Sequence, residues 1–397
     1  MFFLLIVRFF FDSIDRKVYK VGEQVKITHS FLKEPKKNSL GQYFFTSNLL
    51  VSVPLYPKYL YGETVLIEGV VKELRSEEGV LLAIEKPMVT KLGITNPLYF
   101  LTSFIRERVE GVVLATLPTR ESGLFLGIVL GVRDKINNTF YEELRDAGVL
   151  HIIAASGQNV SILASILLVV FQRSVKRRQA ILFTGFCLFI YAGIVGFDPP
   201  IVRATIMALI SFGALTFGRQ NTALFALFLT GWGMLMYQPE NLTSISFQLS
   251  FMSTFGIIMI KPFIEGLFTI QFLGFVKDDL TTTLAAQIAT FPLMASAFGT
   301  YSLLTLPVNL LILWTIPFLM VLGVGSTILA VILPVMAKPL VLLSYPFLAY
   351  FAAIVDLSEQ YKWVVGFDSI PGAFICGYYL IVIGIVFGFK KNEGREI

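Results

Sequence analysis

The period of the hydrophobic residues changes near Pro97. Before that point, apolar residues come in short alternating runs broken by Gly, Pro, Asn and charged clusters, which is the pattern of β-strands. The runs predict strands at Glu23–Leu32, Tyr43–Val53, Thr64–Lys72 and Val80–Glu85. Strands this short and closely spaced favour a small β-barrel of the OB type, which we place at residues 21–92.

An apolar segment precedes this domain. Met1–Phe11 is almost wholly apolar, yet it contains Arg8 and is shorter than the ~20 residues that a membrane-spanning helix needs. It has neither a basic leading region nor a small-residue cleavage site, so a signal peptide is not indicated. We expect residues 1–20 to form an interfacial anchor or the first strand of the barrel.

Helical periodicity predicts membrane-associated helices over residues 97–148. One amphipathic helix has an apolar face made of Leu101, Phe104, Ile105, Val109, Val112 and Val113. A ladder of Gly123, Gly127 and Gly131 follows; it allows close helix approach, and its apolar stretch is short enough to be re-entrant. A second amphipathic helix, marked by Ile136, Phe140, Leu144 and Ala147, ends at Gly148.

Long apolar runs then predict about nine membrane crossings in a transmembrane domain at residues 149–389. The runs are 149–171, 180–197, 201–217, 222–238, 243–264, 281–298, 303–336, 339–356 and 371–389. Pro307, Pro317 and Pro334 interrupt the 303–336 run, which predicts kinked or broken helices. The expected fold class is a polytopic α-helical membrane protein, with some spans broken or re-entrant and an N-terminal OB-like domain.

Composition agrees with a membrane protein. Hydrophobic residues make up 55% of the chain and charged residues 15%, against about a quarter charged residues in soluble domains. This excludes disordered, collagen-like, coiled-coil and soluble globular classes. The two cysteines, Cys187 and Cys376, lie in apolar runs and indicate neither a disulfide framework nor a metal cluster.

The basic residues predict an orientation. Arg173, Lys176, Arg177 and Arg178 lie between the first two expected spans. If crossings alternate, further basic residues fall on the same side, namely Arg219, Lys261, Lys277, Lys338, Lys390, Lys391 and Arg395, with only Lys362 opposite. The positive-inside rule then places the 390–397 tail in the cytoplasm and the β domain outside. The net charge of +5 is modest and by itself indicates no nucleic-acid partner.

Polar residues inside the apolar runs are the candidates for chemistry, because they usually face a bundle interior or an aqueous path. Taken singly, each is explained by hydrogen bonding between helices. An intramembrane serine protease is disfavoured, since His151 and Ser156 are five residues apart, which is about 140° around a helix. No metal-binding pattern is present in the sequence, and a transporter of small solutes stays open as an alternative.

The segment Gly148-Val-Leu-His151-Ile-Ile-Ala-Ala-Ser156-Gly157-Gln158-Asn159-Val resembles the signature of the ComEC competence family, commonly G-L-x-H-L-L-A-x-S-G-L-H-V. Further similar segments follow in the expected order: Leu130-Gly131-Val-Arg133-Asp134, Asp198-Pro-Pro-Ile-Val-Arg203, Phe247-Gln248-Leu249-Ser250-Phe251, Ala286-Gln287 and Pro307-Val-Asn309. The resemblance covers nearly the whole chain. Its departures are Gln158 and Asn159, where the family has Leu and His.

The resemblance implies a channel for single-stranded DNA in the bacterial inner membrane, used in natural transformation. The residues expected along the DNA path are His151, Ser156, Gly157, Gln158, Asn159, Arg203, Gln248, Gln287 and Asn309. A C-terminal metallo-β-lactamase-like domain, found in many members, is not expected here, so we expect no nuclease activity. Catalytic residues, cofactors and metals are likewise not expected.

The implied partners are single-stranded DNA, membrane lipid, a cytoplasmic DNA-translocating ATPase and an exterior DNA receptor. No ATP-binding P-loop is present, so the driving force must come from a partner or a gradient. In OB-folds the connection between the first two strands often contacts nucleic acid, so Lys33, Lys36 and Lys37 are DNA-binding candidates, with a solvated hairpin tip as the alternative. The exterior β domain favours DNA over a small solute.

Overall fold

A computed structural model of the chain describes residues 19–31, 35–37, 41–46, 49–54, 56, 57, 59, 62–76, 79–85, 87–94, 96–153, 156–216, 222–267, 274–361, 363–367 and 371–393. The chain divides into two compact units, Met1–Glu107 and Arg108–Ile397. We call the strands of the first unit the β domain and the second the helical unit. The predictions for Met1–Phe11 and Lys33 lie outside the described residues.

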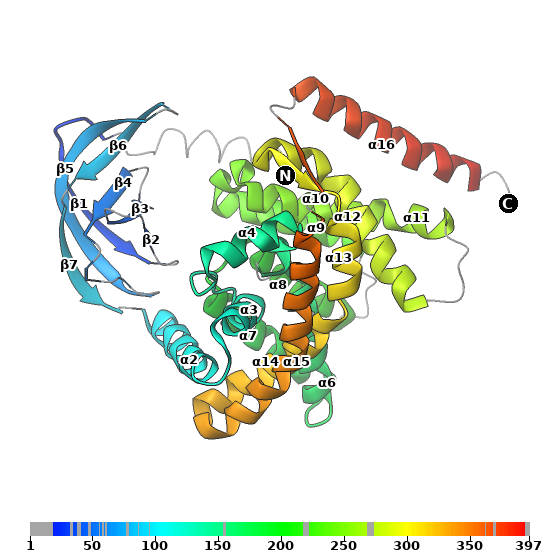
Figure 1. The fold of residues 1–397 in the computed structure, drawn as a ribbon, viewed down its shortest axis with the longest axis horizontal. Coiled ribbons are helices and arrows are strands. Elements are labelled where there is room, and N and C mark those ends of the chain that lie inside the picture. The colour runs from blue at the N-terminus through cyan, green and yellow to red at the C-terminus, as the bar shows by residue number, and fades with distance from the viewer. Residues whose placement is uncertain are drawn as a thin grey trace. The chain divides into compact units, whose positions relative to one another are not determined.

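The β domain is one mixed sheet (Figure 1). Its strands are β1 (Gln24–Ser30), β2 (Lys36–Lys37), β3 (Gln42–Thr46), β4 (Leu49–Val53), β5 (Thr64–Ser76), β6 (Gly79–Glu85) and β7 (Met88–Gly93). They follow the order β1-β5-β6-β4-β3-β2, and β7 also pairs with the long strand β5. All pairs are antiparallel except β4 with β6. Among the described strands this path does not close into a ring.

Two details of the predicted strands are wrong. Tyr43–Val53 is not one strand, because β3 and β4 fold back on each other with Thr46 opposite Leu49. The segment Met88–Gly93 pairs with β5 as β7, although the sequence analysis ended the strands at Glu85. Its side chains are largely exposed, so it lacks the alternating pattern that marks a half-buried strand.

An aromatic cluster fills the core of the β domain. The rings of Phe31, Phe44 and Tyr59 are buried, and His29 stacks on Phe44 with ring centroids 4.9 Å apart. Phe31 meets His29 edge-on and stacks on Tyr59. Such aromatic contacts stabilise a small core beyond the area that they bury. Burial lowers the pKa of His29, so its neutral form is favoured inside the cluster.

Helices form almost all of the remaining structure (Figure 1). They are α2 (Pro97–Leu114), α3 (Thr119–Leu130), α4 (Asn138–Asp146), α5 (Leu150–Ile153), α6 (Gly157–Gln172), α7 (Arg177–Val195), α8 (Pro199–Thr216), α9 (Ala223–Tyr237), η1 (Pro239–Thr243), α10 (Ile245–Met259), α11 (Lys261–Leu267), α12 (Gly274–Phe298), α13 (Thr305–Ile312), α14 (Thr315–Ile332), α15 (Pro334–Glu359) and α16 (Gly372–Glu393). Two short strands, β8 (Thr300–Ser302) and β9 (Val364–Gly366), pair with each other.

Several of these helices mark the chain as a membrane protein. Four described helices, α7, α8, α14 and α15, are long and apolar enough to cross a bilayer, and the bent pair α10 and α11 would make five. Shorter apolar helices are α6, α9 and residues 372–385 of α16. The 303–336 run divides into α13, α14 and the start of α15, so it is broken as its prolines indicate.

The first apolar run, residues 149–171, is not a single helix. The turn α5 ends at Ile153, and α6 begins at Gly157 after Ser156, whose backbone is extended. Helix α2 also differs in part from its predicted amphipathic pattern, which placed Leu101, Phe104 and Val109 on one apolar face. Leu101 and Phe104 of α2 are exposed whereas Val109 is buried.

The glycine ladder belongs to α3, a twelve-residue helix that is buried from Ser122 to Leu130. A Cβ at Gly123 would lie 2.9 Å from the Lys135 carbonyl oxygen, so glycine allows the following loop to pack against the helix. Gly131 ends the helix with a φ of 70°, which favours glycine. At about 1.5 Å per residue, α3 is too short to cross a bilayer, as its sequence predicts.

Helix α12 contains an internal proline, and α16 supplies hydrogen bonds beside it. Pro292 has no N–H, so the carbonyl of Ile288, four residues earlier, loses its helical partner. The hydroxyl groups of Tyr378 and Tyr379 donate to the carbonyl oxygens of Ile288 and Ala289, at 2.9 Å each. Side chains from another helix therefore bind carbonyls next to the proline, which is one way that membrane helices tolerate this residue.

Candidate functional site

The candidate site lies where the C-terminus of α3 meets the N-terminus of α6. A helix leaves its last carbonyls and its first N–H groups without partners inside the helix. The last carbonyls of α3 are buried here, and side chains from neighbouring helices satisfy them. Ends of interrupted helices form the polar sites of many membrane transporters.

Two side chains hydrogen-bond to the last carbonyls of α3. Asn159 of α6 donates from Nδ2 to the Ile128 carbonyl oxygen at 2.9 Å. Tyr191 of α7 donates from its hydroxyl to the Val129 carbonyl oxygen at 3.2 Å. Asn159 is 1% exposed, so it joins two helices in the interior. This geometry fits a side chain that braces two helices, since both partners are buried.

Ser156 caps the start of α6. Its hydroxyl donates to Asn159 Oδ1 at 3.2 Å and accepts from the Asn159 N–H at 3.4 Å. A serine at this position satisfies one of the free N–H groups of the helix. Its hydroxyl has no hydrogen bond with His151 among the described residues.

Arg203 of α8 is the buried cation of this site. It is 7% exposed, and its Nε donates to the Ser250 hydroxyl at 2.7 Å. Its Nη1 donates to the Thr254 hydroxyl and lies 3.6 Å from the sulfur of Met207. Ser250 and Thr254 are one helical turn apart on α10, so both face α8.

Gly157, the first residue of α6, makes room for this guanidinium group. A Cβ at Gly157 would lie 2.5 Å from Nη2 of Arg203 and 3.5 Å from the Cβ of Ala204. Glycine therefore lets α8 approach the start of α6. The structure thus brings Ser156, Gly157, Asn159 and Arg203 together; their role along a DNA path stays a prediction.

The charge of Arg203 has no carboxylate partner in the described part of the chain; its contacts there are two hydroxyls and one thioether. An ionised group taken out of water costs several kcal/mol unless an opposite charge offsets the loss of hydration. Intramembrane charges that stay unpaired usually mark a path or a binding site. Chemically, this arrangement can bind an anion.

The side chains of the other expected path residues take no part in the contacts of Ser156, Asn159 and Arg203 given above. His151 of α5 and Gln158 of α6 are exposed. Gln248 donates to the Leu242 carbonyl oxygen near the start of its own helix, at 2.8 Å. Gln287 Nε2 and Asn309 Oδ1 are buried without hydrogen-bond partners in the described structure, so neither bonds to Arg203 or Asn159.

The lysine turn of the β domain is described only in part. Lys36 and Lys37 form β2, at the end of the sheet order, and pair with β3. Their backbone is therefore at a sheet edge. DNA binding by Lys33, Lys36 and Lys37 stays a prediction.

Sequence analysis missed Thr254 and Tyr191. Thr254 follows Ser250 by four residues, and this spacing could have indicated a polar face on α10. Tyr191 stands in an apolar helix, and its acceptor is a backbone carbonyl 62 residues earlier. No local signal indicates such a contact, because every residue has a carbonyl.

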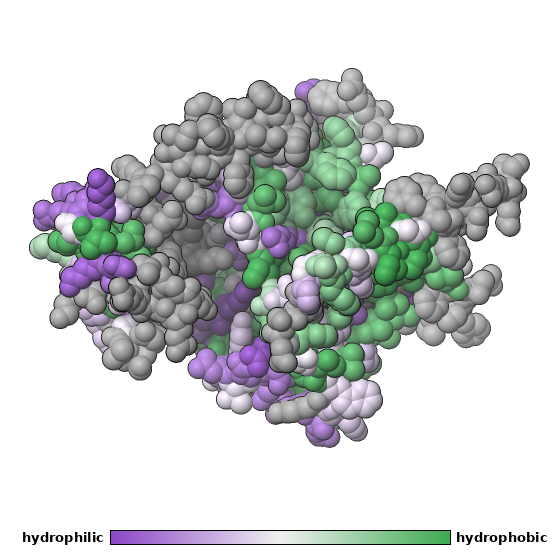
Figure 2. Space-filling model, turned by 90° about the horizontal axis from the view of Figure 1, so that it is seen from above, coloured by the Kyte–Doolittle hydropathy of each residue, from purple (hydrophilic) through white to green (hydrophobic). Residues whose placement is uncertain are grey.

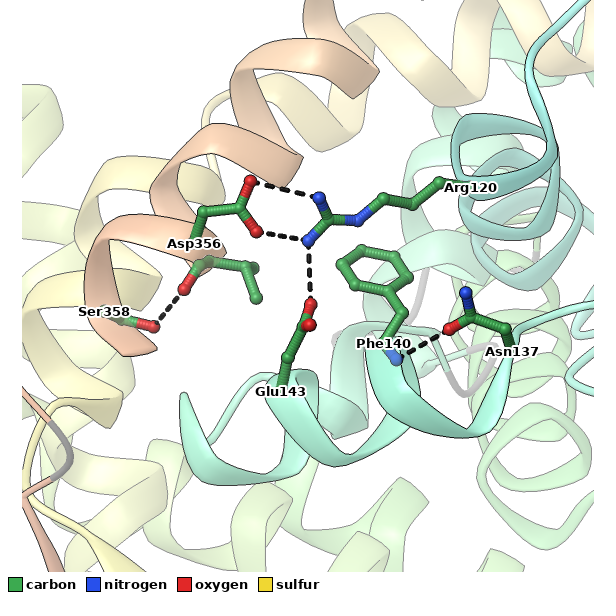
Figure 3. A network of polar contacts seen from close by, with 7 residues as sticks. Arg120, Asn137, Phe140, Glu143, Asp356 and Ser358 are labelled. Atoms are coloured by element: carbon green, nitrogen blue, oxygen red, sulfur yellow. Dashed lines mark hydrogen bonds and ion pairs between the residues drawn. The ribbon is translucent and has the colours of Figure 1, made fainter. Parts of the chain in front are cut away.

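A second polar cluster, also missed, joins α3, α4 and α15 (Figure 3). Arg120, at the start of α3, binds both carboxylate oxygens of Asp356 on α15, and its Nη2 lies 2.8 Å from Glu143 Oε2 on α4. The guanidinium group also lies over the ring of Phe140, 4.1 Å from its centroid. We call Arg120, Glu143 and Asp356 the α3 clamp. It fixes the end of α3 opposite to the candidate site.

Comparisons with known proteins bear on this geometry. The family model described as Competence protein matches residues 128–392. The chain is 25% identical over 217 residues to ComE operon protein 3 of Bacillus subtilis (strain 168). The aligned stretch covers 54% of this chain and 27% of that protein. It is 31% identical over 150 residues to an uncharacterized protein of Aquifex aeolicus (strain VF5), 38% of this chain and 34% of that one.

The chain thus spans about a third or less of the length of the curated relatives it matches. No solved structure matches it. The family match begins at Ile128, so it includes the two α3 carbonyls of the site, those of Ile128 and Val129. It also includes the side chains that bind these carbonyls, Asn159 and Tyr191, and it includes Arg203.

Proposed function

Because the chain belongs to the competence protein family, we propose that it carries single-stranded DNA across the membrane during natural transformation. The matched segment of ComE operon protein 3 supports a role in competence. The proposal assigns no catalytic step to the chain. Its driving force would come from a cytoplasmic DNA-translocating ATPase or a gradient, and an exterior receptor would deliver the strand.

The observation that carries the proposal is the charge of Arg203, which has no carboxylate partner among the described residues and lies beside the first turn of α6. A polyanion needs cationic or dipolar groups along its route, because bare phosphates in an apolar interior lose their hydration. Arg203 and the N-terminus of α6 both carry positive charge or partial charge. They come from α8 and α6, which pack against each other.

The proposal includes the finer topology. We expect about nine crossings in the bacterial inner membrane, with the shorter apolar helices α6, α9 and α16 among them. The β domain, as an OB-like module, would lie outside and the 390–397 tail in the cytoplasm. Cysteines at Lys36 and Gln360 should react with an impermeant label on intact cells, and one at Arg177 should not. Labelling of 177 with protection of 36 would reverse the orientation.

The test of the function is uptake itself. Cells lacking the gene should lose the transfer of fluorescently labelled DNA into the cytoplasm, and a plasmid-borne copy of the full chain should restore it. Membrane content of the restored protein should be measured in parallel. Unchanged DNA entry in the deletion strain would contradict the proposal.

A further inference from the structure

We propose that Arg203 and the first turn of α6 form a binding site for one backbone phosphate of a single-stranded nucleic acid. This inference rests on the proposed function and deepens it, because it names the chemical group recognised and the atoms that recognise it. The site is made of Arg203 Nη2 and the N–H groups of Gly157 and Gln158. It therefore recognises the charge of the backbone and is indifferent to the base.

The first argument is that Nη2 is free to bind. Nε and Nη1 of Arg203 are occupied by Ser250, Thr254 and Met207, whereas Nη2 has no hydrogen-bond partner in the described structure. Nη2 is also not among the fully buried atoms without partners, unlike Gln287 Nε2 and Asn309 Oδ1. The donor that remains is the one that keeps access to a ligand.

The second argument is the direction of this donor. Nη2 lies directly beside Gly157, within 2.5 Å of the place where a Cβ would stand. Gly157 and Gln158 belong to the first turn of α6, so their N–H groups have no acceptor within the helix. The Asn159 N–H, by contrast, is taken by Ser156. An anion at this point would meet a full charge and a helix N-terminus together.

The third argument concerns the kind of anion. A fixed carboxylate would neutralise Arg203 permanently, and the described residues supply none. The unpaired charge fits an anion that comes and goes. Guanidinium N–H groups match phosphate oxygens in geometry, and no side chain of the site presents a pattern that would read a base edge.

Position favours nucleic acid over a lipid headgroup. The groups come from α6, α8 and α10, and Arg203 is 7% exposed. Lipid phosphates gather where basic side chains reach the membrane surface. Arg177 at the start of α7 is exposed, as expected of a basic side chain that reaches the membrane surface, and it serves as the matched control.

The hydroxyls of Ser250 and Thr254 are positioning groups in this site. They hold Nε and Nη1, which turns Nη2 toward Gly157. Asn159 and Tyr191 bind α3 carbonyls and keep the helix ends in place without contacting the phosphate. Only Arg203 and the α6 backbone are assigned direct contact.

The test uses the full-length protein in nanodiscs and two oligothymidylates of equal length. One has ordinary phosphodiester linkages and the other has uncharged methylphosphonate linkages. Wild-type protein should prefer the charged strand. Arg203→Gln should reduce that preference by about ten-fold, the size expected for one charge-assisted hydrogen bond, and Arg177→Gln should leave it near wild type.

Two further variants separate binding from folding. Arg203→Lys keeps the charge and should retain part of the preference. Gly157→Ala places a methyl group against Nη2 and should reduce the preference although Arg203 is intact. Equal preference in wild type and Arg203→Gln, with both proteins folded by circular dichroism, would overturn the proposal.

Lipid binding is the other informative result. If native mass spectrometry shows that Arg203→Gln loses bound phosphatidylglycerol while its preference for the charged strand is unchanged, the site belongs to lipid and the proposal is wrong. DNA uptake in cells distinguishes failure of the proposed function from failure of the phosphate site. A protein that supports DNA entry in cells without an Arg203-dependent preference would keep the proposed function and remove this site.

Discussion

The paired charges of the β domain contrast with one charge of the helical unit, Arg203, although the helical unit also has ion pairs such as those of the α3 clamp. On the β sheet, Lys26 pairs with Glu68 across strands β1 and β5, and Lys91 pairs with Glu63. In the helical unit, Arg203 is buried against hydroxyls and has no carboxylate partner in the described residues. This contrast is consistent with the binding role proposed for Arg203, because charged side chains inside membrane segments usually mark a path or a site.

The surfaces of the β domain and the helical unit also differ in hydropathy. On the face shown in Figure 2, hydrophobic residues cover wide areas of the helical unit, whereas the described part of the β domain mixes hydrophilic and hydrophobic residues. Exposed large side chains such as Phe186, Phe318 and Leu380 stand on α7, α14 and α16. A bilayer accounts for that surface, and water accounts for the mixed one.

Buried amides offer the sharpest test of the comparison. Asn159→Leu removes the hydrogen bond to the Ile128 carbonyl and leaves that carbonyl unsatisfied beside the candidate site. We expect DNA uptake to fall by about 100-fold, measured as transformants per cell, since a shift of roughly 1 Å at a site can cost that much. Membrane content should change little, because hydrogen bonds between membrane helices contribute about 0.6 kcal/mol each.

The matched control is in the β domain. Gln42 is also buried, and its Nε2 donates to the carbonyl oxygens of Pro54 and Pro57 at 2.9 and 3.1 Å. Gln42→Leu should lower uptake far less than Asn159→Leu, and Asn159→His, which keeps a donor, should retain function. Similar losses for the two leucine variants would abolish the distinction between the units.

The α3 clamp should contribute the next largest effect. Asp356→Asn removes one charge from a cluster whose Arg120 and Glu143 are partly buried. We expect a loss of about 1–2 kcal/mol in unfolding free energy, between the values for exposed and buried pairs. Denaturant unfolding in detergent measures it. Glu142→Gln, which breaks the exposed pair with Arg145, should cost less; equal losses would show that the clamp is an ordinary surface pair.

A smaller effect is expected from the lysine turn. Changing Lys33, Lys36 and Lys37 together to Ala should weaken binding of single-stranded DNA a few-fold at moderate salt. The slope of log affinity against log salt should fall by up to about 2, because each single-strand phosphate contact contributes about 0.7. Fluorescence anisotropy with the full-length protein measures both. Unchanged affinity and slope would assign these lysines to the solvated surface.

The smallest effect concerns His29. Burial lowers its pKa in the folded β domain, so the folded state disfavours the protonated form. Stability from the neutral ring is therefore complete above the unfolded pKa of about 6.5 and decreases as the pH falls below it. Protection factors of the β1 amides, measured by hydrogen exchange and corrected for the intrinsic exchange rate at each pH, should fall below that pH in the wild type, and less so in His29→Phe. The same fall in both proteins would identify another group as the cause.

Part of the fold could be predicted from sequence. Strand and helix periods separated the two regions near Pro97, and prolines marked the broken run at 303–336, because these signals are local. The β3 and β4 hairpin and strand β7 were missed, since strand pairing depends on residues far apart in the chain. The number of crossings beyond the four or five qualifying helices stays a prediction.

The sequence by itself determined which residues of the candidate site are polar and unusual: Ser156, Gly157, Asn159 and Arg203 stand out because charged and amide groups are costly among apolar residues. Only the tertiary structure decided how they act. It placed Nη2 of Arg203 on Gly157 and Asn159 on the Ile128 carbonyl, and it brought Thr254 and Tyr191 to the same centre. Such contacts join helices that are distant in sequence, and backbone carbonyls leave no trace in the residue pattern.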